Sequence, residues 1–352
     1  MEAWGERVVR KTRITRKDVA ERAGVSVAVV SYVVNDGPRP VTSGTRAKVE
    51  KAIEELGYYP NELARGLRLR QSSTIGLMTP SFTNPVYGEK AEAIQEVCLP
   101  NGYLTLFVYS GNNPDREKKL VHMFRAKQVD GVIMQPVASD PLEAIKPLQK
   151  ARIPVVLLQH DCPGVPCVVL TDVRGGQLAT QHLLDLGHRR IGLIKGRLPS
   201  AARAEERLLG YHQTLKAAGI EPDPALVIES DVTQNGGYQA MQELLALPEP
   251  PTAVFCHNDV LAVGAMHAVR VAGLSIPDDL SVVGFDDTAG SAHLAPPLTT
   301  VQFSRKEMGH QAATMLFRAI EQDENHEPCT VEIPVKLVVR ASTGPPPQVR
   351  WQ

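Results

Sequence analysis

The pattern of apolar and polar positions changes along this 352-residue chain from a helical spacing to a strand-like one. Between residues 14 and 57, apolar side chains recur three and four positions apart, as they do on amphipathic helices. From Ser73 onward, short apolar runs alternate with helical stretches. The runs are TIGLMTP, YLTLFVY, VDGVIMQP, IPVVLLQ, VVLTD, IGLIKG, ALVIES, TAVFCHND and LSVVGFDD. The pattern predicts an all-α head followed by an α/β core of doubly wound parallel sheet.

Two short helices in the head are separated by a glycine. Thr15 is a good N-cap, and Asp18 favours the first turn that follows it. Gly24 ends this helix and supplies a tight turn, after which Ser26 can cap a second helix. Two short helices joined at a glycine turn predict a helix-turn-helix. In the second helix Val30, Val33 and Val34 would face inward, and Val27, Ala28, Ser31 and Tyr32 outward.

A third helix and a short connector complete the region before the core. Thr42 can cap a helix that runs to about Leu56, and Gly57 is its stop signal. Asn61 can cap a connector helix that is too short to be stable alone in water. The expected divisions are a flexible tail (1–13), a helix-turn-helix domain (14–60), a hinge helix and linker (61–73), a core (74–343) and a disordered tail (344–352).

Motifs in a fixed order extend along almost the whole chain. In the head and hinge they are GVSVAVVSYVVN, VTSGTR, AIEELGYYPN and LARGL. In the core they are LLDLGHRRIGLIKG, PTAVFCHNDVLAVGAM, DLSVVGFDD and PPLTTV. With these motifs the chain resembles the lactose-repressor/galactose-repressor family of bacterial transcription regulators. The resemblance covers residues 14 to 343, and it implies a core of two lobes of the periplasmic-binding-protein type.

The resemblance also implies which residues meet DNA. It assigns base reading to Val27, Ala28 and Tyr32, and phosphate contact or orientation to Thr15, Ser26, Ser31, Asn35, Thr42, Thr45 and Tyr58. In the hinge it adds Asn61, Ala64 and Leu67, with Leu67 as a wedge between base pairs in the minor groove. Val27 and Ala28 can give only apolar contact, for example to a thymine methyl. We therefore expect specificity to rely on methyl contacts and DNA shape.

A ligand site is expected beyond the carboxyl ends of the core strands, where doubly wound sheets bind their ligands. The strand that ends at Thr171 leads into Asp172 and a helix start, which is a plausible passage to the second lobe. The expected effector-binding residues are Asn84, Tyr87, Gln159, Arg203, Val232, Asn258 and Asp286. Asn258 and Asp286 match positions that bind ligand hydroxyls in the family. An amide and a carboxylate together suit a polyol or sugar.

Three positions in this site depart from the family pattern. Val86 and Val232 stand where many members carry an aromatic ring, and Gln159 stands where an aspartate is frequent. The loss of two stacking surfaces and one charge argues against a purine-like effector and favours a small sugar or another polar metabolite. Nearby, we expect Asp259 to cap the helix that follows it, and Arg207 to stabilise a lobe rather than to contact the effector.

Composition and charge agree with a globular DNA-binding regulator. No uncharged apolar run reaches the roughly 18 residues of a membrane span, and the N-terminus is too charged for a secretory signal. A cytoplasmic location is therefore expected. The net charge of −1 hides an asymmetry: residues 1–72 carry 14 Lys and Arg against 9 Asp and Glu, and the remainder carries 24 against 30. Five scattered cysteines predict reduced thiols, with no metal site and no cofactor.

Other classes of function fit the sequence less well. An enzyme is disfavoured because the chain holds no GxSxG, HExxH or GxxxxGK[ST] signature. A solute-binding protein shares the core fold, but the head argues against it. A regulator controlled mainly by a protein partner stays open. The favoured interpretation is a repressor that binds a near-palindromic double-stranded operator as a homodimer, with a tetramer left open. The expected effector is a small carbohydrate, which would change its operator affinity.

Overall fold

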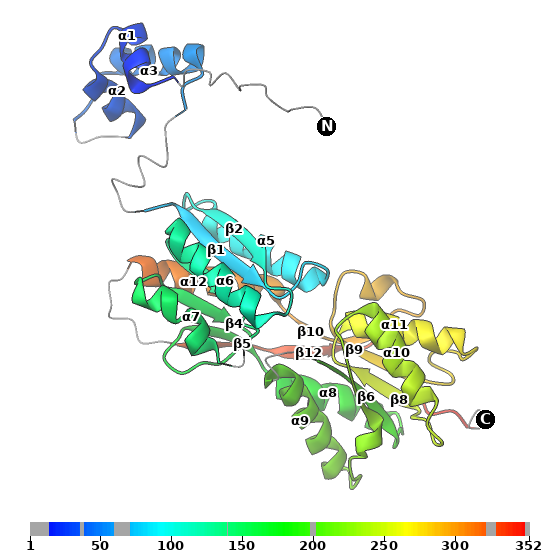
Figure 1. Cartoon of the computed structure of the whole chain (residues 1–352). Coiled ribbons are helices and arrows are strands. Elements are labelled where there is room, and N and C mark those ends of the chain that lie inside the picture. The colour runs from blue at the N-terminus through cyan, green and yellow to red at the C-terminus, as the bar shows by residue number, and fades with distance from the viewer. Residues whose placement is uncertain are drawn as a thin grey trace, which may run out of the picture. The chain divides into compact units, whose positions relative to one another are not determined.

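The computed structural model describes residues 14–35, 39–59, 71–138, 140–197, 202–321 and 329–348, without the side chains of residues 202–204. The chain divides into two compact units, Met1–Ser72 and Ser73–Gln352 (Figure 1). The division falls where the apolar pattern changes from helical to strand-like. The expected tail over residues 1–13 and the hinge residues Asn61, Ala64 and Leu67 lie outside the described residues.

The head contains three helices, as the sequence predicts. They are α1 (Arg16–Ala23), α2 (Val27–Val34) and α3 (Ser43–Leu56). The predicted residues Thr15, Ser26 and Thr42 stand at the three N-caps, while Gly24 and Gly57 end α1 and α3 in the left-handed backbone conformation that glycine adopts without strain. A small apolar core joins the helices. Its fully buried members are Val19, Val30 and Val49.

The core unit contains two six-stranded sheets. The first holds β1 (Thr74–Thr79), β2 (Leu104–Tyr109), β3 (Gly131–Met134), β4 (Val155–Leu158), β5 (Cys167–Leu170) and β11 (Thr330–Ile333). The second holds β6 (Ile191–Gly196), β7 (Val227–Ser230), β8 (Ala253–Cys256), β9 (Ser281–Asp286), β10 (Thr299–Phe303) and β12 (Val335–Val338). The spatial orders are β11-β5-β4-β3-β1-β2 and β12-β10-β9-β8-β6-β7.

Helices cover both faces of each sheet and define two lobes. Lobe 1 is the first sheet with α5 (Pro85–Cys98), α6 (Pro114–Lys127), α7 (Pro141–Lys150) and α12 (Arg305–Glu321). Lobe 2 is the second sheet with α8 (Asp172–Asp185), α9 (Ala202–Ala217), α10 (Gln234–Leu245), α11 (Asp259–Val271) and the 3₁₀ turns η1 (Pro224–Leu226) and η2 (Ser291–His293). Successive residues of β1, Leu77 and Met78, join different apolar clusters, because strand side chains alternate between the two faces.

The chain passes between the lobes at three places in the described ranges: after β5, after β10, and between β11 and β12. The first passage is the one that the sequence predicts at Asp172. The predicted fold of two doubly wound lobes is confirmed, with all nine apolar runs forming β1 to β9. One detail is different. The edge strand β12 pairs with β10 in the antiparallel direction, so the second sheet is not parallel throughout.

The structure describes the first part of the C-terminal segment that the sequence predicts to be disordered. The segment expected to be disordered begins at residue 344, but the structure describes the chain up to residue 348. The Gly344 amide donates to the Ser281 hydroxyl at 3.0 Å, and the Gly344 carbonyl oxygen lies 2.9 Å from Nε2 of the buried His188. These bonds attach the start of the segment to lobe 2.

Candidate functional site

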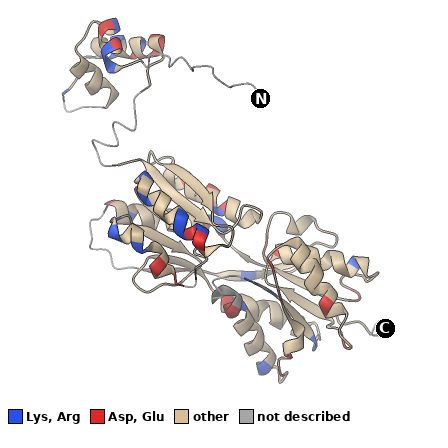
Figure 2. Ribbon diagram, viewed as in Figure 1, with Lys and Arg blue, Asp and Glu red and all other residues tan. Residues whose placement is uncertain are grey.

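The outward face of α2 is apolar and uncharged. The Ser26 hydroxyl accepts a hydrogen bond from the Val29 amide at 3.3 Å, which fixes the start of the helix. Val27 and Ala28 are exposed immediately after this cap, and Tyr32 lies half-buried one turn further on. Figure 2 shows charged residues on α1 and α3 but none on α2. A base edge meeting this face would find methyl groups, one phenol ring and the Ser31 hydroxyl.

The predicted phosphate-contacting residues are polar groups at helix ends. The Thr15 backbone amide donates to the Asp18 carboxylate at 2.7 Å, as in a capping box, and the Thr15 hydroxyl donates to the same oxygen at 2.7 Å. Thr42 and Thr45 are joined by a hydroxyl–hydroxyl bond of 2.9 Å. Asn35 donates to the Ser31 carbonyl oxygen at 2.8 Å, which closes the end of α2. The Tyr58 ring is buried, and its hydroxyl accepts from Arg16 at 3.4 Å.

In the core unit, six of the seven expected effector residues lie around one cavity of about 30 Å³ between the lobes. They are Asn84, Tyr87, Gln159, Val232, Asn258 and Asp286, and the lining is completed by Val86, Arg207 and His257. The seventh, Arg203, is in the first turn of α9, and its side chain lies outside the described residues. Residues from loops more than 200 positions apart thus meet at the carboxyl ends of the strands.

Two asparagines of the cavity have their side-chain oxygens committed to helix caps. Asn84 caps α5 by accepting from the Val86 amide at 3.0 Å, and Asn258 caps α11 by accepting from the Leu261 amide at 3.0 Å. The expected cap at Asp259 is therefore wrong by one residue. Each cap orients its amide, and the amide nitrogen remains as the group that can donate to a ligand.

Asp259 has a different role, below the cavity. Its carboxylate is buried and accepts from the Thr288 amide at 2.8 Å, the Ser291 hydroxyl at 2.5 Å and the Thr300 hydroxyl at 2.6 Å. Burial raises the pKa of Asp259, while these hydrogen bonds lower it. These bonds connect the start of α11 to β10 and to the loop that follows β9. Asp286 is the last residue of β9, immediately before this loop.

Lys90 is a site residue that the sequence analysis missed. It lies on the buried face of α5 with 1% of its surface exposed. Its ammonium group donates to Gln135 Oε1 at 2.8 Å and to Gln159 Oε1 at 3.0 Å, and lies 4.7 Å from the centroid of the Tyr87 ring. Lys90 thereby contacts two cavity-lining side chains, those of Gln159 and Tyr87. The available signal was its helical spacing from Val86 and Ile94 on the buried face.

Arg207 joins three elements of lobe 2 beneath the cavity. Its Nε donates to Asp172 Oδ1 at 2.7 Å, another guanidinium nitrogen donates to the His257 carbonyl oxygen, and the guanidinium carbon lies 3.4 Å from the centroid of the Phe285 ring. These contacts agree with the expected stabilising role. Arg207 also lines the cavity, so a bound effector would be able to contact it.

Asp286 is the carboxylate of the cavity, and its surroundings oppose its ionisation. Burial raises its pKa to about 7, although Arg207, Lys90 and Arg305 each lower it and Asp259 raises it further. The backbone of Asp286 has φ 111° and that of Gln159 has φ 54°, a region that side-chain-bearing residues rarely adopt. Such conformations cluster at binding sites, where the surrounding structure holds them.

Arg305 links the backbone at Asp286 to lobe 1. It follows β10 at the second passage between the lobes, and its Nε donates to Glu89 of α5 at 2.5 Å. Its two terminal nitrogens donate to the backbone oxygens of Asp286 and Asp287. A movement of one lobe relative to the other would therefore strain or break contacts at the edge of the cavity.

A helix-turn-helix head and a two-lobed core with a polar cavity define a ligand-responsive DNA-binding regulator. Comparisons with known families agree. The model of the lacI family of bacterial regulatory proteins matches residues 15–61, and that of the periplasmic binding protein-like domain matches residues 180–343. The HTH-type transcriptional regulator DegA of Bacillus subtilis (strain 168) is 36% identical over 337 residues, covering 95% of this chain and 99% of DegA.

Two solved structures extend this likeness to three dimensions. The Lac repressor dimer bound to operator and the anti-inducer ONPF is 32% identical, with a TM-score of 0.85 over 95% of this chain and 100% of the repressor chain. The complex of the transcriptional regulator CelR with cellobiose is 33% identical, with a TM-score of 0.70 over 94% and 100% of the two chains. This chain belongs to the lacI family: it is a DNA-binding transcriptional repressor with an effector-binding core.

The comparisons confirm the resemblance stated from the motifs and the exclusion of an enzyme, because the family consists of transcription regulators. In the described part of the chain, no helix is long and apolar enough to cross a membrane.

Proposed function

We propose that this repressor binds a near-palindromic operator as a homodimer and that a small carbohydrate in the interlobe cavity changes its operator affinity. The dimer is proposed because the similar Lac repressor is a dimer on its operator. Base reading is assigned to Val27, Ala28 and Tyr32, whose uncharged face would contact thymine methyls. Operator binding implies a cytoplasmic location.

The cavity chemistry supports a polyhydroxylated ligand. Asn84, Asn258 and Gln159 have their side-chain oxygens engaged, so each can offer an amide N–H, while Asp286 offers carboxylate oxygens. Sugar hydroxyls both donate and accept, and they can satisfy this mixed set. Val86 and Val232 supply apolar contact but no aromatic face for a flat ring. The CelR relative is a complex with cellobiose, a sugar. The observation that carries the proposal is this convergence of amide donors and one carboxylate.

The size of the cavity supports control by movement of the lobes. Its volume of about 30 Å³ is far below the roughly 300 Å³ or more of typical ligand pockets. A sugar can enter only if the lobes separate or the lining side chains rearrange. The effector would therefore select a different lobe arrangement, and linkage requires that this arrangement have a different operator affinity.

The effector half of the proposal is tested by thermal unfolding of the full chain with cellobiose, ribose and a purine base. We expect at least one sugar, and not the purine, to raise the melting temperature. Asn258→Ala should abolish the shift. Asn101→Ala, on the surface beyond α5, is the matched control and should retain it. A purine-selective shift would contradict the assigned chemistry.

The DNA half is tested separately by selecting duplexes from a randomised pool. We expect a two-fold symmetric sequence to be enriched, because each protomer of a dimer reads one half-site. Val27→Ala should weaken binding to the selected duplex and relax preference at one base pair, by roughly 1 kcal/mol for a lost methyl contact. Enrichment of an asymmetric single site would overturn the dimer proposal.

A further inference from the structure

The consecutive residues Asp286 and Asp287 both adopt positive φ angles, of 111° and 54°. Residues with side chains rarely adopt this region of backbone conformation, and two in succession need support from the surrounding structure. Asp286 ends β9 and supplies the carboxylate of the effector cavity, whereas Asp287 is not among the residues that line the cavity. The contacts of Asp287 therefore bear on the placement of Asp286.

The Asp287 carboxylate is 8% exposed and is held by two side chains of lobe 2. Its Oδ1 lies 2.6 Å from Nη2 of Arg340, and its Oδ2 accepts a hydrogen bond from Gln302 Nε2 at 2.5 Å. Gln302 is the residue of β10 that pairs with Asp286 in the sheet register. Asp287 is thus fixed to β10 by Gln302 and to the chain beyond β12 by Arg340.

Arg340 is itself fixed to lobe 2 by its backbone and by its guanidinium group. Its amide donates to the Thr299 hydroxyl at 2.9 Å, and its Nη1 donates to the Leu298 carbonyl oxygen at 2.8 Å. The guanidinium group therefore bridges the start of β10 and the Asp287 carboxylate. Because its donors have a rigid, planar arrangement, this bridge fixes the direction of the carboxylate as well as its distance.

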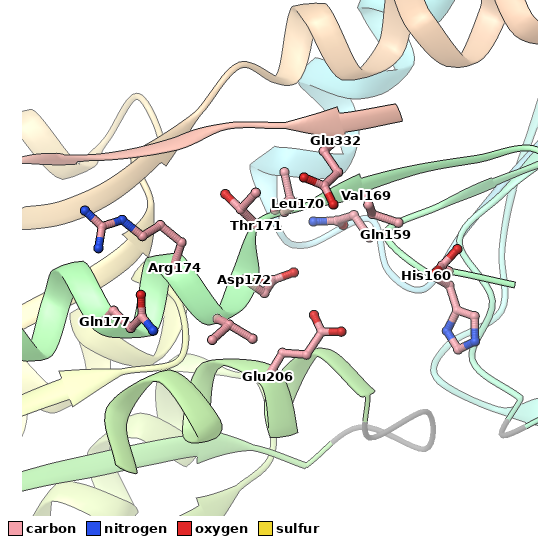
Figure 3. A pocket seen from close by; sticks show the side chains of 12 residues that line it. Gln159, His160, Val169, Leu170, Thr171, Asp172, Arg174, Gln177, Glu206 and Glu332 are labelled. Carbon is pink, nitrogen blue, oxygen red and sulfur yellow. The ribbon is translucent and has the colours of Figure 1, made fainter. Parts of the chain in front are cut away.

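Arg340 reaches this place after the third passage between the lobes. Figure 3 shows the last strand before that passage, where Glu332 of β11 lies beside Val169 of β5 in lobe 1. The chain then enters lobe 2 as β12, which pairs with β10, and Arg340 follows two residues after β12 ends. The anchor of Asp287 thus comes from a segment more than 50 positions away in the sequence.

We propose that Arg340 is a positioning residue for the effector site: through Asp287 it holds Asp286 in the conformation that places its carboxylate in the cavity. Arg305 bonds to the backbone of the same two residues and to Glu89 of lobe 1, so a movement of the lobes changes its contacts. The contacts of Arg340 with Leu298, Thr299 and Asp287 lie within lobe 2 and keep Asp286 in place during that movement. The inference rests on the proposed function, which assigns the Asp286 carboxylate to a carbohydrate.

The test compares Arg340→Met with Arg190→Met in the full chain. Arg190 is a matched control in lobe 2: its side chain is 25% exposed, pairs with Asp223 at 3.0 Å and donates to the Glu249 carbonyl oxygen at 2.6 Å. Each variant loses one partly exposed ion pair and one bond to the backbone, so the two stabilities should fall alike. We expect only Arg340→Met to raise the dissociation constant of the sugar that stabilises the wild type, by about fivefold or more.

A second measurement does not depend on the sugar. It follows hydrogen–deuterium exchange, by mass spectrometry, in the peptide that contains Asp286 and Asp287 in the ligand-free proteins. We expect exchange to be about fivefold faster in Arg340→Met than in the wild type, because the backbone after β9 opens more often without its anchor. Exchange in this peptide should be unchanged in Arg190→Met.

Three results overturn the positioning role of Arg340: unchanged exchange in Arg340→Met, full sugar affinity in that variant, or an equal loss of sugar affinity in both variants. A different result separates the proposed function from this inference. If no sugar stabilises the wild type, the carbohydrate effector is removed, and the exchange measurement still decides whether Arg340 holds Asp286 in place.

Discussion

At the scale of single residues, several ionisable groups of the core lie around the cavity. The cations among them do not fully offset the effect of burial on the carboxylate. Asp286 is buried among Arg207, Lys90 and Arg305, yet burial outweighs these cations and keeps its pKa high, at about 7. A carboxyl group held near its titration point can act as a donor or an acceptor toward a ligand hydroxyl. The same balance makes the stability of lobe 2 depend on pH.

The first prediction concerns Asp286→Asn. Because the folded-state pKa of Asp286 lies above the usual value of 3.8, the folded chain binds this proton more tightly than the unfolded chain between about pH 4 and pH 7. Its contribution to stability is full below about pH 4 and is lost as the pH rises through about 7, with an upper limit of roughly 4 kcal/mol. The variant should show a flatter pH dependence of the free energy of urea unfolding. Parallel curves for both proteins would contradict this assignment.

The second prediction concerns Lys90→Met, which removes the buried ammonium but keeps the apolar stem. The oxygens of Gln135 and Gln159 lose their donor, so we expect the free energy of unfolding to fall by about 2 kcal/mol and sugar binding to weaken. Lys119→Met, at an exposed position of α6, is the matched control and should change neither. Full sugar affinity in Lys90→Met would show that Gln159 needs no such support.

Sequence reasoning predicted the convergence of the cavity residues because strand ends of a parallel sheet meet at one edge. It did not identify Lys90 or the bonds of Arg305. In the run EKAEAIQE, the helical spacing of Lys90 from Val86 and Ile94 was the one signal, and it does not show that α12 packs over α5. Arg305 contacts Glu89, which lies 216 positions away in the sequence, and Asp286, which lies 19 positions away. These contacts depend on how the two lobes meet.

At the scale of elements, the sequence predicted the helices and strands whose positions depend on local interactions, such as helix caps and apolar runs. The caps at Thr15, Ser26 and Thr42 define the head helices, and nine apolar runs define β1 to β9. The strands β10, β11 and β12 were not predicted. The last two are four residues each, partly exposed and separated by Pro334, so they lack a strong apolar run. Their pairing with β5 and β10 forms only after the chain has passed between the lobes.

The third prediction tests helix packing in lobe 2. The helices α10 and α11 approach so closely at Gly264 that a Cβ there would lie 1.8 Å from the Gln234 carbonyl oxygen. Gly264→Ala must push the helices apart, and we expect the free energy of unfolding to fall by about 3 kcal/mol. Gly290→Ala, where an added Cβ meets nothing within 4 Å, is the control and should be nearly neutral. Equal stability of the two variants in urea would contradict the packing.

At the scale of the whole molecule, the chain combines two units with different chemistry. The head has the uncharged helix α2, which we propose reads bases, and the charged helices α1 and α3, and the core has an acidic, donor-rich interlobe region. The interlobe cavity is too small to hold a sugar in this arrangement, so sugar binding requires that the lobes separate or that the lining side chains rearrange. The proposed regulation follows if the same movement changes how two heads engage one operator.

The most direct test of this coupling measures the fluorescence anisotropy of a labelled duplex, taken from the selection described above, as the full chain is added. The titration is done with and without the sugar that raises the melting temperature of the protein. We expect the sugar to change the duplex dissociation constant about fivefold or more in the wild type, and Asn258→Ala to bind the duplex normally without responding to the sugar. Identical dissociation constants for the wild type with and without a saturating sugar would contradict it.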